Sequence, residues 1–110
     1  MERLVKGDVI ILEFPFSDLI QAKRRPALVV KIPKGEDLIV LQITAKSQEP
    51  PVEILITSKD FGQGKLKTNS YLRLDKVFSV DKSLIKYKIG SLRQEKFSEI
   101  IETVCDYLRS

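Results

Sequence analysis

Two short polar segments carry residue types that could act on a phosphate group. The first is Lys23-Arg24-Arg25-Pro26, which lies where a polar stretch gives way to an apolar one. An arginine side chain presents a planar set of N–H donors that matches two oxygens of one phosphate. Considered alone, a run of charges such as this is more often a solvated surface.

The second segment is Thr44-Ala45-Lys46-Ser47-Gln48, which considered alone is typical of an ordinary polar loop. If residues 25–32 and 38–44 form an antiparallel hairpin, the start of one strand lies beside the end of the other. Arg25 and Thr44 then approach each other across the hairpin. A fixed cation and a hydroxyl at one point would stabilise negative charge on a phosphate.

The complete absence of histidine limits the chemistry that is possible. With no histidine and one cysteine, Cys105, the chain cannot form a Ser-His-Asp or Cys-His catalytic site. It also lacks the usual ligands of zinc, copper and non-haem iron. We therefore expect neither a metal nor a cofactor, and any chemistry must use arginine, lysine, hydroxyl groups or carboxylates.

Five apolar segments have the length and composition of β-strands and are bounded by turn-forming residues. They are residues 8–14, 25–32, 38–44, 52–56 and 71–80, the last with an expected bend near Asp75-Lys76. The first segment is apolar almost throughout, which indicates burial on both faces, as in a small closed barrel or at a subunit contact. The sequence predicts loops over residues 16–24, 45–51 and 58–67, and a short helical turn within 81–87.

The end of the chain has the pattern of an amphipathic helix. Apolar residues recur there at helical spacing: Phe97, Ile100, Ile101, Val104 and Leu108. Ser91 and Gln94 fit a capping box, which predicts a helix of about 15 residues beginning after Ser91. Cys105 lies near the apolar stripe and is expected to be inert core.

The size and charge of the chain fit a small basic domain. It has 110 residues and a net charge of +4, and the basic excess lies in residues 51–92, with 8 basic and 4 acidic side chains. Such an excess permits a polyanionic partner such as nucleic acid. No apolar run approaches the ~18 residues needed to span a membrane, and no signal-peptide pattern is present. We therefore expect a cytoplasmic protein.

These elements predict one domain over residues 1–110 that is mainly β with a C-terminal helix. The simplest arrangement is an SH3-like small barrel of about five to seven antiparallel strands, because closure hides strand edges.

Other residues give weaker indications. Phe16 could stack on a nucleobase, and Ser70 could bind a ligand or shape a turn. Residues 62–65, Gly-Gln-Gly-Lys, resemble a phosphate-binding loop only loosely, because no suitable helix follows. Three aspartates lack metal-ligand spacing and are expected to be turn or surface carboxylates: Asp60, Asp75 and Asp81.

The order of several motifs resembles the MazF/PemK family of toxin endoribonucleases from type II toxin–antitoxin systems. The motifs are Gly7-Asp8-Val9-Ile10-Ile11-Leu12-Glu13-Phe14, Arg24-Arg25-Pro26-Ala27-Leu28-Val29-Val30, Ile43-Thr44-Ala45-Lys46, Gly64-Lys65-Leu66, Ser70-Tyr71-Leu72-Arg73-Leu74-Asp75-Lys76 and Ile89-Gly90-Ser91-Leu92. They extend over nearly the whole chain. Some members carry an acidic residue where Ile20 stands here, so that carboxylate role does not transfer.

The resemblance implies an SH3-like barrel, a homodimer, a role in growth regulation and metal-independent cleavage of single-stranded RNA. It also implies a cognate antitoxin that inhibits the toxin by occupying the RNA groove. Arg25 matches the family's catalytic arginine and Thr44 its catalytic threonine. We expect the RNA-binding residues to be Phe16, Ser17, Arg24, Lys46, Ser47, Gln48 and Ser70.

The expected reaction is attack of a ribose 2′-hydroxyl on the adjacent phosphorus, which gives a 2′,3′-cyclic phosphate and a 5′-hydroxyl. Two other readings stay open. A small barrel of this kind can be a non-catalytic module that binds nucleic acid or protein. A gyrase poison is less favoured, because relatives of that type use a C-terminal tail with tryptophan and this chain has none.

Overall fold

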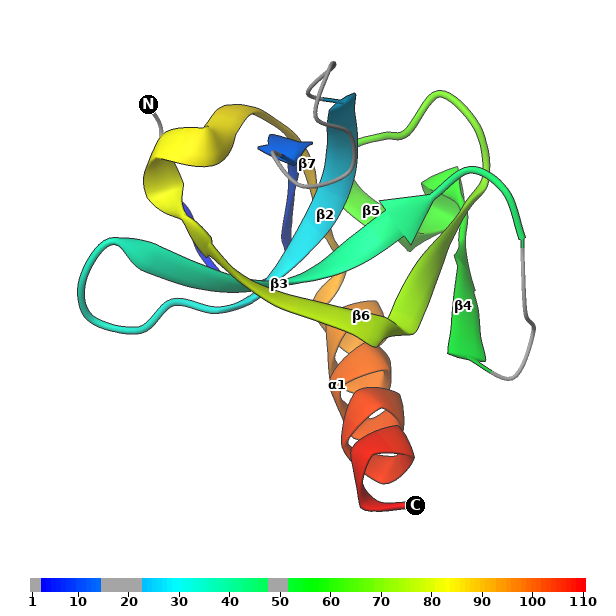
Figure 1. Cartoon of the computed structure of the whole chain (residues 1–110). Coiled ribbons are helices and arrows are strands. Elements are labelled where there is room, and N and C mark those ends of the chain that lie inside the picture. Colours follow the sequence, from blue (N-terminus) through cyan, green and yellow to red (C-terminus); the bar gives the residue numbers. More distant parts are fainter. Residues whose placement is uncertain (1–2, 15–22, 48–51) are drawn as a thin grey trace.

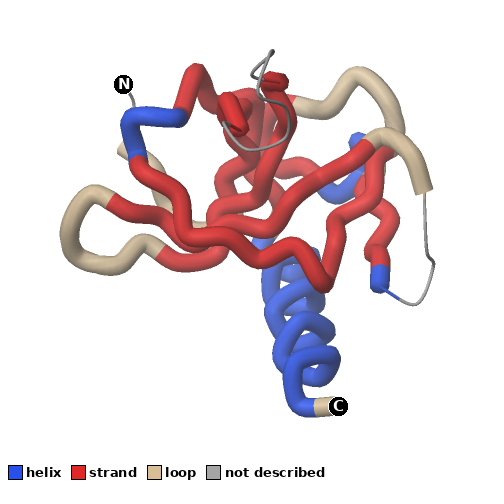
Figure 2. The backbone as a smooth tube through the Cα atoms, in the orientation of Figure 1, coloured by secondary structure: helices blue, strands red, loops and turns tan. Residues whose placement is uncertain are grey.

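The computed structural model describes residues 3–14, 23–47 and 52–110 and is built mainly from antiparallel strands. The seven strands are β1 (Asp8–Phe14), β2 (Lys23–Lys31), β3 (Asp37–Thr44), β4 (Glu53–Ile56), β5 (Phe61–Gly64), β6 (Ser70–Asp81) and β7 (Ile85–Leu92). Among the described residues the chain also forms the 3-10 turns η2 (Ser58–Asp60) and η3 (Lys82–Leu84) and the helix α1 (Gln94–Arg109). The predicted class, mainly β with a C-terminal helix, is confirmed (Figure 2).

The strands form one sheet in the order β4-β6-β3-β2-β1-β7-β5. The sheet curls into a half-barrel, and α1 extends away from one side of it (Figure 1). β6 makes the sharpest turn in this curl. Leu41 pairs with Val77 and Ile43 with Leu72, so residues 73–76 of β6 bulge opposite one residue of β3. The bend expected near Asp75-Lys76 is confirmed.

The central strands β1, β2 and β3 carry apolar residues on both of their faces, because both faces pack against core clusters. Side chains alternate between the two faces of a strand, so neighbours belong to different clusters. In β1, Val9 packs with α1 in one core cluster, while Ile10 and Leu12 pack with η3 and β7 in the other. All three side chains are fully buried. The predicted two-sided burial of the first strand is thus confirmed.

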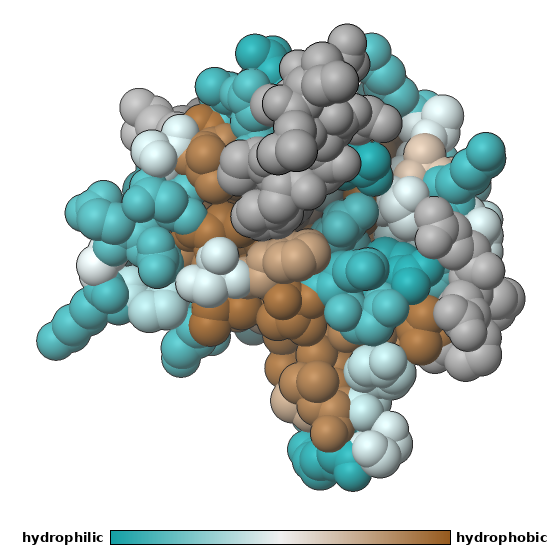
Figure 3. Space-filling model, in the orientation of Figure 1, coloured by the Kyte–Doolittle hydropathy of each residue, from teal (hydrophilic) through white to brown (hydrophobic). Residues whose placement is uncertain are grey.

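Helix α1 covers the first cluster with part of its apolar stripe. Ile100 is fully buried and Val104 nearly so, whereas Leu108 is 66% exposed. The C-terminal turns extend past the sheet, and an apolar surface runs along the helix (Figure 3). No helix within the described residues is long and apolar enough to cross a membrane.

The capping box predicted at Ser91 and Gln94 is wrong. The helix begins at Gln94 with Arg93 as its N-cap, and the amide of Phe97 donates to the carbonyl of Arg93. Ser91 instead lies in β7, where its hydroxyl donates to the buried carboxylate of Asp8 at 2.8 Å. Because Ser91 pairs with Asp8 in the β1–β7 ladder, the helix begins only after it, at Gln94.

Two strands fall where no strand was predicted. β5 lies in the segment predicted as the loop 58–67, and β7 occupies residues that were expected to hold a turn and a connection. Both are rich in glycine or charge, which hides the strand pattern. They pair with each other through Phe61–Leu92 and Gly64–Gly90, and this pairing extends the sheet. The predicted helical turn within 81–87 is η3.

Candidate functional site

The β2–β3 hairpin brings the two predicted catalytic residues to the same end of the sheet. The β2–β3 ladder ends here with the residue pair Ala27–Gln42. Arg25 and Thr44 lie two residues beyond this pair on their strands. Alternation puts both side chains on the face that carries Ala27 and Gln42. The two strand ends diverge beyond this pair (Figure 1). Arg25 and Thr44 therefore lie on neighbouring strands, at the same end and on the same face of the hairpin.

The β1–β2 ladder orients the two arginines in opposite directions. Arg25 pairs with Leu12 and is partly exposed, while Arg24 pairs with Glu13 and is exposed. Because neighbouring side chains on a strand point to opposite faces, the two guanidinium groups serve different surfaces. Arg25 shares a face with Thr44, whereas Arg24 lies on the face of Pro26.

Thr44 is held by a local hydrogen bond. Its Oγ1 accepts the backbone N–H of Lys46 at 3.3 Å, which forms a tight turn after β3. This bond uses an acceptor lone pair of the hydroxyl, so its proton remains able to donate to a ligand oxygen. The arrangement fits the predicted role of Thr44 as a donor.

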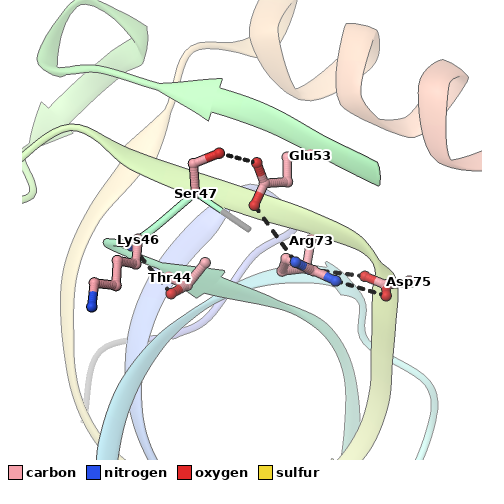
Figure 4. A network of polar contacts seen from close by, with 6 residues as sticks. All are labelled: Thr44, Lys46, Ser47, Glu53, Arg73 and Asp75. Atoms are coloured by element: carbon pink, nitrogen blue, oxygen red, sulfur yellow. Dashed lines mark hydrogen bonds and ion pairs between the residues drawn. The ribbon is translucent and has the colours of Figure 1, made fainter. Parts of the chain in front are cut away.

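A polar network lies beside this turn (Figure 4). Ser47 Oγ donates to Glu53 Oε1 at 2.7 Å, and Glu53 Oε2 lies 3.5 Å from Arg73 Nη1. Arg73 also binds both carboxylate oxygens of Asp75, at 2.9 and 2.8 Å. These hydrogen bonds from Arg73 hold the pKa of Asp75 below its usual value. Asp75 is therefore the partner of an arginine within the strand bend, in line with its predicted structural role.

An apolar groove of about 430 Å³ opens at the same end of the sheet. It is lined by Ile11, Pro26, Ala45, Lys65, Leu66, Lys67, Thr68, Ser70, Tyr87 and Ile89. Two of these residues, Pro26 and Ala45, directly follow Arg25 and Thr44 in sequence. Arg25 itself points to the other face of β2, so it does not line the groove.

The groove contains three residues that were not among the predicted RNA-binding residues, namely Lys65, Lys67 and Tyr87. The lysines follow β5, and Tyr87 is 50% exposed on β7 opposite Ile11. Two cations and an aromatic ring around an apolar floor suit a nucleotide, whose base is apolar on its faces and whose phosphate is anionic. The basic excess of residues 51–92 includes the two lysines, but the sequence alone does not indicate which lysines of this region lie close together.

The other predicted RNA-binding residues have varied positions. Lys46 is exposed in the turn after Thr44. Ser70 lines the groove but is only 4% exposed, and its hydroxyl donates to the carbonyl of Thr68 at 3.1 Å. Ser70 thus shapes the loop that carries Lys65 and Lys67. Three further residues, Phe16, Ser17 and Gln48, lie outside the described residues.

Glu13 is a carboxylate near Arg24 at this end of the sheet. The Lys86 ammonium, 2.8 Å away, donates to it and lowers its pKa, with a smaller contribution from the charge of Arg24. A lowered pKa keeps Glu13 ionised and makes it a weak proton acceptor. Glu13 is therefore better suited to orienting neighbouring cations than to acting as a general base.

The remaining candidates have local structural partners. Asp60 accepts the backbone N–H of Thr57 at 2.8 Å, and Asp81 accepts that of Ser83 at 2.8 Å, so both are turn residues as predicted. Cys105 is half-buried on α1. Across residues 3–14, 23–47 and 52–110, no three acidic or cysteine side chains cluster closely enough to hold a metal ion.

Comparison with solved structures shows the same fold in several toxins. An endoribonuclease in complex with its cognate antitoxin, from a mycobacterial species, matches with a TM-score of 0.75 and 14% identity over 96% of this chain and 95% of that one. MazF from Deinococcus radiodurans matches with a TM-score of 0.73 and 20% identity over 96% of both chains. The Mycobacterium tuberculosis toxin MazF-mt6 matches with a TM-score of 0.72 and 17% identity over 93% of this chain and 96% of that one.

The fold is thus that of the small toxins built on a curled antiparallel sheet with a terminal helix. The family model described as "PemK-like, MazF-like toxin of type II toxin-antitoxin system" matches residues 5–108. The chain therefore belongs to this toxin family, as the motif order indicated. No individually curated protein sequence matches the chain significantly.

Proposed function

We propose that this protein is a toxin that cleaves single-stranded RNA without a metal ion. The observation that carries the proposal is that Arg25 and Thr44 lie on the same face at the open end of one hairpin. Membership of the MazF-like toxin family supports it, as does the likeness to structures described as endoribonucleases.

The proposed reaction begins with attack of a ribose 2′-oxygen on the neighbouring phosphorus. The bond from phosphorus to the 5′-oxygen breaks, the 2′-hydroxyl loses its proton and the leaving oxygen gains one. The products are a 2′,3′-cyclic phosphate and a 5′-hydroxyl. Negative charge builds on the non-bridging oxygens in the transition state, where donors such as Arg25 and Thr44 are most effective.

Arg25 is proposed to act as an electrostatic donor. A guanidinium carries N–H donors and no acceptor atom, so it is a poor proton acceptor. Its planar N–H groups can hold two phosphate oxygens at once. The Thr44 hydroxyl, whose oxygen already accepts from Lys46, would donate its proton to the same phosphate.

The RNA is proposed to continue from Arg25 and Thr44 into the groove lined by Pro26 and Ala45. Arg24 and Lys46 are exposed next to Arg25 and Thr44 in the chain, and Lys65 and Lys67 line the groove. Phe16, Ser17 and Gln48 remain predicted contacts from the neighbouring loops, and Ser70 would act by shaping the groove. Tyr87 offers an exposed ring on which a base could stack.

The protein is further proposed to act in the cytoplasm as a homodimer that regulates growth, and to be inhibited by a cognate antitoxin. One of the similar structures is an endoribonuclease bound to its cognate antitoxin. The apolar groove with Lys65 and Lys67 in its lining would suit a segment of such a partner that carries both apolar and acidic residues. Light scattering of the purified protein would show whether it is a dimer.

The test is incubation of the purified protein with a long single-stranded RNA in the presence of EDTA, followed by mapping of the ends. We expect cleavage with 2′,3′-cyclic phosphate and 5′-hydroxyl ends, and none of a DNA strand of the same sequence, because DNA lacks the attacking hydroxyl. Cleavage that EDTA abolishes and Mg²⁺ restores would contradict the proposal. Salt-sensitive RNA binding without cleavage would indicate a non-catalytic binding module.

A further inference from the structure

A nearly buried ionic cluster lies directly behind the turn that follows Thr44. Within it the Arg73 side chain is 8% exposed and that of Glu53 is 3% exposed, while Asp75 is 30% exposed. Glu53 and Arg73 are opposite each other in the β4–β6 ladder. Ser47 is exposed, and its hydroxyl reaches inward to Glu53 at 2.7 Å (Figure 4).

Stability alone is a weak reason for such a cluster. Removing charges from water costs several kcal/mol per ion, and apolar residues of similar volume often replace a buried ion pair without loss. Asp75 already binds Arg73 through two hydrogen bonds, and Glu53 lies farther from Arg73, at 3.5 Å. The contact of Glu53 with the Ser47 hydroxyl is shorter, at 2.7 Å, which indicates that holding Ser47 is part of the role of Glu53.

The turn from Thr44 to Ser47 is fixed at both ends. At its start, the Thr44 hydroxyl accepts the Lys46 amide at 3.3 Å, and at its end Ser47 binds Glu53. β6 links the two ends, because Tyr71 pairs with Thr44 and Arg73 pairs with Glu53. Lys46 lies between these anchors with its side chain exposed.

We propose that Glu53 is a positioning residue that acts through Ser47 on the Thr44–Ser47 turn. It fixes the turn so that the Thr44 hydroxyl and the Lys46 ammonium keep one orientation toward the phosphate. This inference rests on the proposed ribonuclease function. It also gives Ser47 a different role from the predicted RNA contact, because its proton is donated to Glu53 and is not available to RNA.

The first test compares Ser47→Ala with Ser47→Thr, which keeps the hydroxyl, and with Ser98→Ala, which removes an exposed serine on α1. A shift of a catalytic group by about 1 Å can cost ~10²-fold in rate. We expect Ser47→Ala to lower kcat at least about 10-fold with little change in KM. Ser47→Thr and Ser98→Ala should keep kcat near that of the parent protein.

Glu53→Met separates positioning from direct contact, because the Glu53 side chain is only 3% exposed and offers almost no surface to RNA. Met matches the volume of Glu, and Arg73 stays paired with Asp75. We expect the same loss of kcat as for Ser47→Ala, and no further loss in the double variant, because both changes break one link. A raised KM in Ser47→Ala with normal kcat in Glu53→Met would overturn the proposal and make Ser47 an RNA contact.

Hydrogen exchange of the Lys46 amide tests the anchor without any RNA. The parent protein should protect this amide, and Ser47→Ala and Glu53→Met should both speed its exchange relative to Ser98→Ala. Unchanged exchange in both variants would overturn the anchoring role even if RNA is cleaved. If exchange speeds up but the parent protein cleaves no RNA, the proposed ribonuclease function fails while the anchor stands.

Discussion

Arg25 provides the most specific chemical test at the scale of a single residue. A lysine supplies the same charge but lacks the planar pair of donors that grips two phosphate oxygens. We expect Arg25→Ala to lower kcat/KM by about 10²–10³-fold, and Arg25→Lys to recover only a small part of that loss. Single-turnover cleavage of a labelled RNA measures both variants. Full activity in Arg25→Lys would mean that charge alone is sufficient.

Asp75 should make stability depend on pH. Hydrogen bonds from Arg73 lower its pKa in the folded protein, so its ionised form stabilises the fold. This contribution is complete above the pKa of an unfolded aspartate, about 3.9, and is lost as the pH falls through the lower folded value. We expect Asp75→Asn to unfold at less urea than the parent protein at pH 7.

That difference in urea midpoint should shrink as the pH falls below about 4, because the unfolded chain then binds a proton at Asp75 before the folded protein does. Asp106→Asn is the matched control, because Asp106 pairs with Arg109 at an exposed site and should change little. A deficit of Asp75→Asn that stays constant from pH 7 down to pH 2 would contradict the assigned pair.

At the scale of elements, the β5–β7 pairing depends on close backbone approach. Gly64 has a φ of +70°, and a Cβ there would overlap the carbonyl oxygen of Ile89. Gly35 has a φ of +109° but no atom within 4 Å of such a Cβ. Gly64→Ala should therefore cost more than the ~1–3 kcal/mol of backbone strain alone, and Gly35→Ala only the strain.

Urea unfolding of the two glycine variants measures this difference. Because Lys65 and Lys67 directly follow Gly64, we also expect Gly64→Ala to weaken RNA binding, while Gly35→Ala leaves binding unchanged. Equal destabilisation of the two variants would show that the β5–β7 contact tolerates a side chain.

Much of the element layout is readable from the sequence because it depends on burial. β1, β2, β3 and β6 carry continuous or alternating apolar residues, and the α1 stripe repeats at helical spacing. β5 is Phe-Gly-Gln-Gly, with a single buried side chain, and its pairing with β7 depends on partners distant in sequence. The start of the helix was predicted too early because the Ser91 hydroxyl donates to Asp8, 83 residues away in the chain, and does not cap the helix.

The site was predictable to the extent that it follows from a local hairpin. Arg25 and Thr44 are brought to the same end by the register of β2 and β3, which sequence patterns indicate. The groove was not predictable, since Lys65, Lys67 and Tyr87 meet Pro26 only after the sheet has curled. The pairing of Glu53 with Arg73 was likewise not predictable, because the strand register decides which residues of β4 and β6 face each other.

At the scale of the whole molecule, RNA binding should depend strongly on salt. Each phosphate contact to a single strand contributes about 0.7 to the slope of log K against log salt concentration. Lys65→Ala combined with Lys67→Ala should therefore reduce the slope by up to about 1.4. Binding of a 2′-O-methyl RNA, which cannot be cleaved, measures the slope without interference from the reaction.

Lys34→Ala provides the control for the lysine variants. Lys34 is exposed in the turn between β2 and β3, at the opposite end of the hairpin from Arg25 and Thr44. Its removal changes the net charge in the same direction as each groove variant, but the slope should stay the same. A slope that falls equally for Lys34→Ala would mean that the RNA feels only overall charge and does not follow the groove.

The convergence of Arg25 and Thr44 on one phosphate is tested most directly by a double-mutant cycle. Single-turnover cleavage rates are measured for the parent protein, Arg25→Ala, Thr44→Val and the double variant, with one RNA. If both donors hold the same phosphate, the double variant loses clearly less than the product of the two single losses, because either change already disturbs that contact. Losses that multiply fully, or a single variant with unchanged cleavage, would contradict a shared phosphate site.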